Sequence, residues 1–146
     1  MRIAVLKSWV YSGYVSKNLK KSGERLYVDS SGNVMGMQYM EIADNFQAFG
    51  GLRLEAIDSY HGEGYSPIIK IGANVSINFD CHIAAINRID IGDGTMIGSK
   101  VLIIDHSHGM GNKGDIHSQR AMPLGTFHLW SSHPKQLTHN LHLGGE

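Results

Sequence analysis

The chain has 146 residues, of which 42% are hydrophobic and 18% are charged, so its composition fits one modest folded domain and argues against extensive disorder. Thirteen basic and thirteen acidic residues give zero net charge, which argues against a surface built mainly to bind nucleic acid. The single cysteine, Cys81, excludes an internal disulfide framework and a multi-cysteine zinc site, and it predicts a reducing, cytoplasmic environment. Eighteen glycines against three prolines indicate many tight turns on a repeating backbone.

Residues 1–33 form a basic N-terminal segment. Its basic side chains are Arg2, Lys7, Lys17, Lys20, Lys21 and Arg25. The apolar run at its start is interrupted by Lys7, so we expect neither a membrane span nor a signal peptide. The segment could contact an anionic membrane surface, but the composition favours a solvated leading segment or a short helix.

A six-residue repeat organises residues 34–110 and is clearest over 71–104. The leading isoleucines are Ile71, Ile77, Ile83 and Ile89, and then, after a slip of two residues, Ile91, Ile97 and Ile103. A modest side chain stands four residues later, at Val75, Cys81, Thr95 and Val101. A period of six is neither the helical period nor the simple alternation of a two-faced strand.

This period predicts a solenoid of triangular cross-section, in which each hexapeptide supplies one short strand and one corner. The leading isoleucine and the residue four later point inward. Corners are expected at residues 72–74, 92–94 and 98–100, because Gly, Asn, Asp and Ser tolerate left-handed backbone angles. The slip before Ile91 is expected to be absorbed as a longer corner.

Three motifs carry a resemblance to a known family: IGANVSINFD at 71–80, IDIGDGTMIGSK at 89–100 and DHSHG at 105–109. With them the chain resembles the bacterial hexapeptide-repeat acyltransferases, especially the sugar O-acetyltransferases of the galactoside, maltose and lipopolysaccharide type. The resemblance implies an all-β fold, the left-handed parallel β-helix. It also implies acetyl-coenzyme A as acyl donor, a sugar or polysaccharide precursor as acceptor, and a homotrimer with active sites in grooves between chains.

The resemblance places the catalytic base on His108, with His106 as the alternative if the loop is shifted. A sugar hydroxyl must lose its proton as it attacks a thioester, and imidazole, whose ordinary pKa is about 6.5, suits that role. The other interpretation makes both histidines plain loop residues. The resemblance also places Asn78 at the family position that holds the acceptor, a role that suits an amide because it can both donate and accept hydrogen bonds; alternatively, Asn78 caps a corner.

Two further features have structural interpretations. Cys81 occupies a small inward position, so packing is favoured over a nucleophilic role. Residues 59–67, which contain Tyr60, His61 and Tyr65, are expected to leave the solenoid as a surface loop; contact with substrate is the less favoured reading.

Residues 111–146 form a tail without six-residue spacing. Since the family continues with further coils here, we expect a β-helix that is incomplete at its C-terminus. A shifted reading frame from about residue 126 is one explanation. The tail histidines lack the short spacing of a ligand set, so no metal is expected there.

Three functions follow from these features. The leading hypothesis is an acetyl-coenzyme A-dependent sugar O-acetyltransferase of surface polysaccharide synthesis. The alternatives are a zinc-dependent hydratase of the same fold, with His82, His106 and His108 as ligands, and an inactive truncated solenoid. The histidine loop at 105–109 favours the transferase over the hydratase.

Overall fold

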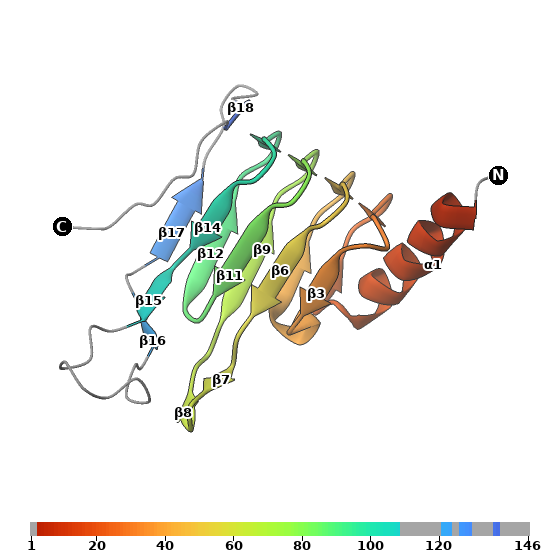
Figure 1. The fold of residues 1–146 in the computed structure, drawn as a ribbon. Coiled ribbons are helices and arrows are strands. Elements are labelled where there is room, and N and C mark those ends of the chain that lie inside the picture. Colours follow the sequence, from red (N-terminus) through yellow and green to blue (C-terminus); the bar gives the residue numbers. More distant parts are fainter. Residues whose placement is uncertain (1–2, 109–120, 124–125, 130–135, 138–146) are drawn as a thin grey trace.

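The protein is a stack of short parallel strands with one helix at its end (Figure 1). The computed structural model describes residues 3–108, 121–123, 126–129 and 136–137, and side chains over residues 3–106. The helix, α1, spans Ile3–Asn18, and a 3-10 turn, η1, spans Met37–Tyr39. Successive strands visit three parallel sheets in turn, here called A, B and C, which form the sides of a prism.

The strands of each sheet stack in coil order. Sheet A contains β1 (Lys21–Ser22), β4 (Met40–Ile42), β9 (Ile68–Ile71), β12 (Arg88–Ile91) and β17 (Thr126–Leu129). Sheet B contains β2 (Tyr27–Val28), β5 (Gln47–Ala48), β10 (Ser76–Ile77), β13 (Met96–Ile97) and β18 (Gln136–Leu137). Sheet C contains β3 (Asn33–Met35), β6 (Arg53–Ala56), β11 (His82–Ala85) and β14 (Leu102–Ile104). The fold is a left-handed parallel β-helix, which confirms the predicted fold class.

Two antiparallel hairpins lie outside this stack. They are β7 (Ser59–Tyr60) with β8 (Glu63–Gly64), and β15 (His106–His108) with β16 (Ala121–Pro123). Both hairpins project from the prism at the same corner, the one between sheet C and sheet A. No helix in the described part of the chain combines the length and apolarity that crossing a bilayer requires.

Stacked aliphatic side chains fill the axis of the prism. The predicted inward isoleucines Ile71, Ile77, Ile83, Ile91, Ile97 and Ile103 are all at most 3% exposed. In sheet C, Leu54, Ile83 and Ile103 lie opposite one another in three successive coils. Burying one such side chain contributes roughly 1.5–3 kcal/mol, so this column is a main source of stability.

Each regular coil takes twenty residues, three hexapeptides plus two. Lys21 lies opposite Glu41 in sheet A, and Ile77 lies opposite Ile97 in sheet B. The two extra residues form the corner between β11 and β12, at positions 86 and 87. The slip in the repeat is therefore a longer corner, as predicted, but it lies before Arg88 and not at Ile89 and Asp90, which are inside β12.

The other corners are built from left-handed residues. Asn45, Asn74 and Gly94 have φ values of 59°, 57° and 68° and follow one another in successive coils. The Asn45 side-chain amide donates to Oδ1 of Asn74 at 2.9 Å, which ties two coils together. Lys100, with φ of 60°, marks a further predicted corner. Asn and Gly are the residues that adopt this conformation at least cost.

The coils begin at Lys21, inside the segment 1–33 that the sequence analysis treats separately. At the other end, β17 and β18 lie in the segment 111–146, where the sequence shows no six-residue spacing, and they extend sheets A and B. Most of that segment, and with it the shifted-frame hypothesis, lies outside the described residues.

α1 covers the first coil with polar side chains. The backbone N–H of Val28 donates to Oγ of Ser12 at 2.8 Å, and that of Ser30 donates to Oγ of Ser8 at 3.0 Å. A third backbone N–H, on Val34, donates to the Tyr11 hydroxyl at 3.2 Å. The helix thus supplies acceptors that a preceding coil would otherwise provide, which is why its buried face carries serines.

Candidate functional site

A cavity of about 380 Å³ lies on the outer face of sheet C, between β6, β11 and β14 and the loops that follow them. Its lining residues are Arg53, Glu55, Ile57, Tyr60, His82, Ala84, Ile86, Leu102, Ile104 and His106. Alternate residues of a strand point to opposite faces, so the outward positions of sheet C line this cavity while the inward ones fill the core. Sheet C faces the viewer in Figure 1.

One end of the cavity holds a buried carboxylate between two basic side chains. Oε1 of Glu55 accepts from Nε of Arg53 at 2.9 Å, and its Oε2 lies 3.0 Å from Nε2 of His82. Glu55 is buried, whereas Arg53 is exposed and His82 is half-buried. A carboxylate removed from water requires such partners, so Glu55 fixes the orientation of the His82 ring.

His106 lines the other end of the cavity, and its neighbour Asp105 lies buried behind it. Asp105 is 2% exposed, and its two carboxylate oxygens accept the backbone N–H groups of Ile86 and Asn87, each at 2.9 Å. Its Oδ1 also lies 3.2 Å from Nδ1 of His106. Asp105 therefore holds the longer corner of the coil beneath and orients the imidazole above it.

This pairing matters for the chemistry of His106. An imidazole that donates its Nδ1–H to a carboxylate carries its lone pair on Nε2, and the carboxylate stabilises the imidazolium that forms when Nε2 takes a proton. His106 is itself buried at the edge of the cavity. The arrangement can therefore supply a general base.

The two histidines lie at opposite ends of the cavity. His82 pairs in register with Leu102, and His106 follows Leu102 by four residues. At about 3.3 Å per residue this separates them by about 13 Å along the strand direction. Ala84 and Ile104, which lie opposite each other, form an apolar floor between them.

The predicted base, His108, is the last residue of β15, where its backbone lies opposite Ala121. Its side chain lies outside the described residues. Asn78 follows β10 at the corner between sheets B and C, is half-buried, and donates its backbone N–H to the carbonyl of Ile97 at 2.9 Å. Asn78 and His106 thus lie beyond opposite ends of the sheet C strands, and a single chain does not bring them together.

Cys81 is buried at its predicted inward position. Its Sγ lies 3.0 Å from the carbonyl oxygen of Gly98, and burial raises the pKa of the thiol. A neutral thiol with no access to solvent is a poor nucleophile, so the geometry supports packing.

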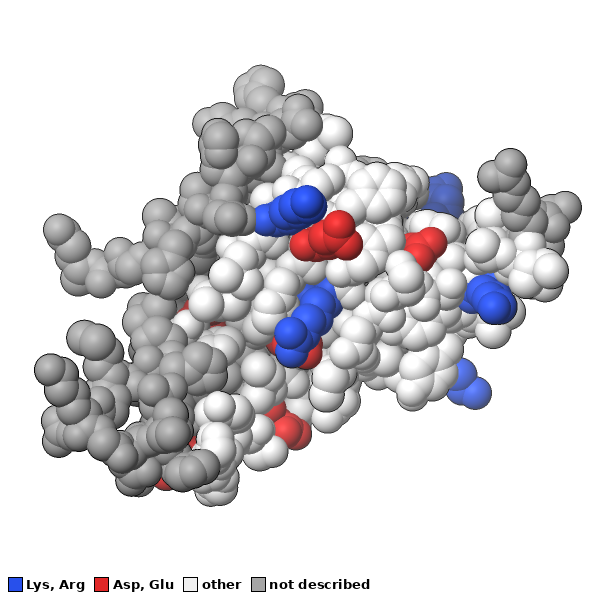
Figure 2. Space-filling model, viewed as in Figure 1, with Lys and Arg blue, Asp and Glu red and all other residues white. Residues whose placement is uncertain are grey.

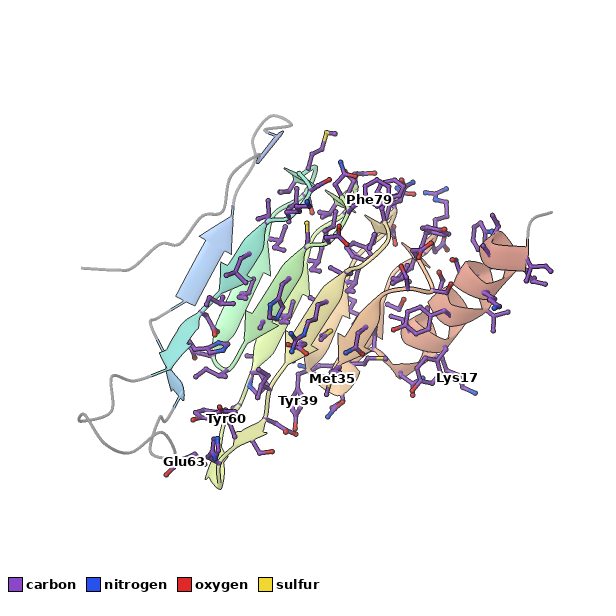
Figure 3. The ribbon with its side chains drawn as sticks, viewed as in Figure 1. Lys17, Met35, Tyr39, Tyr60, Glu63 and Phe79 are labelled. Carbon is purple, nitrogen blue, oxygen red and sulfur yellow. The ribbon has the colours of Figure 1, made fainter. Side chains whose placement is uncertain are left out.

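Residues 59–67 leave the solenoid, as predicted, and carry the β7–β8 hairpin (Figure 3). Tyr60 lines the cavity, and its ring meets that of His61 edge-on with centroids 4.3 Å apart. At the base of the hairpin, the Tyr39 hydroxyl donates to Oδ2 of Asp58 at 2.9 Å. Tyr60 is therefore placed to contact a molecule bound in the cavity.

Sequence reasoning missed Glu55 and Asp105. Glu55 gives a weak signal: with Arg53 it forms a charged pair two residues apart, the spacing of one strand face. Asp105 stands directly before the histidine loop, but its double backbone contact depends on the corner of the preceding coil and has no local signature.

The histidines that the zinc hypothesis names as ligands are not arranged around a common point in the described part of the chain. Among the side chains of residues 3–106, no group of three or more His, Cys, Asp or Glu is arranged to hold a metal ion. The described nitrogens of His82 and His106 face the carboxylates of Glu55 and Asp105. The third candidate ligand, His108, has its side chain outside the described part.

A larger cavity, of about 800 Å³, lies on sheet A, and four of its charged side chains form two ion pairs. Glu41 contacts Lys20 at 3.1 Å and Lys70 at 3.5 Å, and the hydrogen bond from Lys20 lowers the pKa of Glu41. Arg88 and Asp90 are 2.7 Å apart, which raises the pKa of Arg88. These pairs satisfy the charges of the sheet itself.

Comparison with curated proteins finds an Escherichia coli (strain K12) protein described as "Putative lipopolysaccharide biosynthesis O-acetyl transferase WbbJ". The two sequences are 35% identical over 97 residues, which is 66% of this chain and 43% of that protein. The chain is thus similar to a lipopolysaccharide O-acetyltransferase. The likeness supports the sugar O-acetyltransferase resemblance of the hexapeptide motifs, while the chain spans less than half the length of this relative. No protein-family model and no solved structure matches the chain.

Proposed function

We propose that the chain belongs to an O-acetyltransferase that moves an acetyl group from acetyl-coenzyme A to a sugar hydroxyl in lipopolysaccharide or related polysaccharide synthesis. The observation that carries the proposal is the 35% identity with WbbJ. The β-helix fold and the carboxylate-held histidine at the sheet C cavity support it.

The reaction needs one base and one acid. The base takes the proton of the sugar hydroxyl as its oxygen attacks the thioester carbonyl, and a carbon–oxygen bond forms. The carbon–sulfur bond then breaks, and the imidazolium returns the proton to the departing thiolate. One histidine can perform both transfers, so no second titratable group is required.

We assign the base to His108, the position that the resemblance implies, with His106 as the alternative. His106 has the support of its contact with Asp105. Asn78 is assigned to the acceptor. Since Asn78 and the histidine loop lie at opposite edges of sheet C in one chain, the assignment requires the Asn78 edge of one chain to meet the histidine edge of a neighbour. A homotrimer of prisms provides such grooves.

The test incubates the purified full chain with acetyl-coenzyme A and a panel of sugar and nucleotide-sugar acceptors. The measured quantity is the release of free coenzyme A. Loss of the base in His108→Ala should lower kcat by about 10²–10⁴ with little change in the KM for acetyl-coenzyme A. Asn78→Ala should raise the KM for the acceptor instead. The matched control is Asn18→Ala, an exposed position at the end of α1.

Other outcomes separate the alternatives. Activity that survives His108→Ala and is lost in His106→Ala moves the base by two residues and keeps the reaction class. No coenzyme A release with any acceptor favours an inactive solenoid, and zinc-dependent hydration of carbon dioxide favours the hydratase. If light scattering shows a stable, folded monomer, the proposed groove between chains is excluded.

A further inference from the structure

The buried side of α1 carries two serines together with the apolar Val15. Ser8 and Ser12, one turn apart, are buried against the first coil, where Oγ of Ser8 donates to the carboxylate of Asp29 at 3.2 Å. Both hydroxyls also accept backbone N–H groups of that coil. Because this edge of the β-helix presents hydrogen-bonding groups, the helix face that covers it carries these two hydroxyls beside Val15.

The opposite side of α1 is apolar and exposed. Ile3, Leu6, Val10 and Tyr14 follow one another at spacings of three, four and four residues, so they form one stripe along the helix. They are 75%, 49%, 68% and 57% exposed. A surface helix of a globular protein normally has the reverse arrangement, with its apolar stripe toward the core. The stripe therefore has a role outside the packing of this chain.

The stripe lies in a strongly basic setting. Residues 1–23 contain five Lys and Arg residues and no Asp or Glu, although the whole chain has zero net charge; one of the five, Lys20, pairs with Glu41. Lys7 and Lys17 are exposed on α1 itself, and Trp9 is 56% exposed while its ring meets that of Tyr27 edge-on. Figure 3 labels Lys17 at the C-terminal part of the helix, and Figure 2 shows blue side chains at this end of the molecule.

We infer that α1 docks the protein flat on an anionic phospholipid bilayer. A helix with Leu, Val and aromatic side chains on one face and flanking lysines fits the boundary between lipid headgroups and acyl chains. Anionic lipids attract the lysines, while the apolar stripe enters the boundary. The helix is sixteen residues long, so it lies on a bilayer and does not span it.

A second copy of this chain fits the stripe less well. An isologous pair would bring the same face of two helices together, and with it the lysines of both. Those like charges would repel, and no acidic residue within 1–23 is available to offset them. An anionic bilayer is complementary in charge as well as in polarity.

The test measures binding of the full chain to vesicles of phosphatidylcholine alone and of phosphatidylcholine with 30% phosphatidylglycerol. The chain has two tryptophans, so a Trp130→Phe background leaves Trp9 as the reporter. We expect co-flotation with the anionic vesicles only, a blue shift of Trp9 emission, and binding that weakens as salt rises. Sedimentation in the absence of lipid reports the oligomeric state.

Two pairs of variants connect binding to the stripe. Leu6→Ser with Val10→Ser should lower the partition coefficient at least about tenfold, while Met35→Ser with Met96→Ser removes two comparably exposed side chains elsewhere and should not. Lys7→Gln with Lys17→Gln should lower it about 30-fold, since each lysine near such a surface contributes about 1 kcal/mol. Lys100→Gln is the matched control.

Three results would overturn the inference. They are absence of binding to anionic vesicles at low salt, equal binding to neutral and anionic vesicles, and unchanged binding by the Leu6 and Val10 variant with a retained circular dichroism spectrum. If that variant instead changes the sedimenting species without affecting vesicle binding, the stripe is a contact between copies of the chain. None of these measurements uses acetyl transfer, so their outcome is independent of the proposed function.

Discussion

Replacement of Asp105 by alanine should destabilise the protein more than any exposed corner substitution. Its carboxylate accepts the backbone N–H groups of Ile86 and Asn87 at the two-residue extension of the coil beneath. A buried N–H that loses its acceptor costs about 1–3 kcal/mol. The backbone N–H of buried Ile86 should cost nearly this full amount, whereas the N–H of half-buried Asn87 can form a hydrogen bond to water in part. We therefore expect a loss of about 2–4 kcal/mol in the free energy of unfolding.

Urea unfolding followed by circular dichroism measures this loss, with the slope of the transition checked for two-state behaviour. Asp93→Ala is the matched control, because the exposed Asp93 accepts one exposed backbone N–H, that of Ala73, at 2.7 Å. It should cost about 1 kcal/mol or less. Asp105→Asn keeps one acceptor oxygen and should fall between the two. If Asp105→Ala costs no more than Asp93→Ala, the carboxylate does not hold the corner and the reasoning is refuted.

Three further predictions concern the solenoid and its helix. Ile97→Asp places a charge in the axis and should abolish soluble protein, whereas Lys100→Asp should not; equal yields of both would refute the register. Gly13→Ala should raise the free energy of unfolding by about 0.5–1 kcal/mol, because Gly13 is exposed within α1 and an added Cβ meets nothing; a loss in urea unfolding would contradict this. Hydrogen bonds from Ser31 and Ser8 lower the pKa of Asp29, so its stabilisation is present above the ordinary carboxyl pKa of 3.8 and is lost as pH falls through the lower folded value. Asp29→Asn should therefore show a smaller fall in urea midpoint between about pH 5 and pH 2 than the unchanged chain; equal falls would contradict it.

The repeat predicts the fold well because isoleucine spacing reports the inward positions directly. Ile77 and Ile83 illustrate this, since both are fully buried where the six-residue period places them. The repeat does not predict the first coil, because Leu26 and Val28 occupy its inward positions without the Ile-Gly pattern. Its place becomes evident only from pairing with the next coil.

The site is less predictable than the fold. Local sequence singles out the histidine loop, but the partners of the histidines come from other coils: Glu55 precedes His82 by 27 residues. Nor does composition predict which side of α1 faces solvent. That orientation follows from the backbone edge beneath it, where Ser12 contacts Val28.

The two longest extensions between the described strands enter at one corner of the prism. Met40 and Ile69, one coil apart in sheet A, are separated by 29 residues where a regular coil uses twenty, and Arg88 and Thr126 by 38. The extra segments start where sheet C ends, beside the cavity that holds Tyr60 and His106. Loops can therefore lengthen, shorten or be exchanged there without changing the spacing of rungs in the core. Evolution could change which molecule binds beside such a scaffold by altering loop sequence alone, and an engineer could graft a foreign loop at residues 57–67 by the same route.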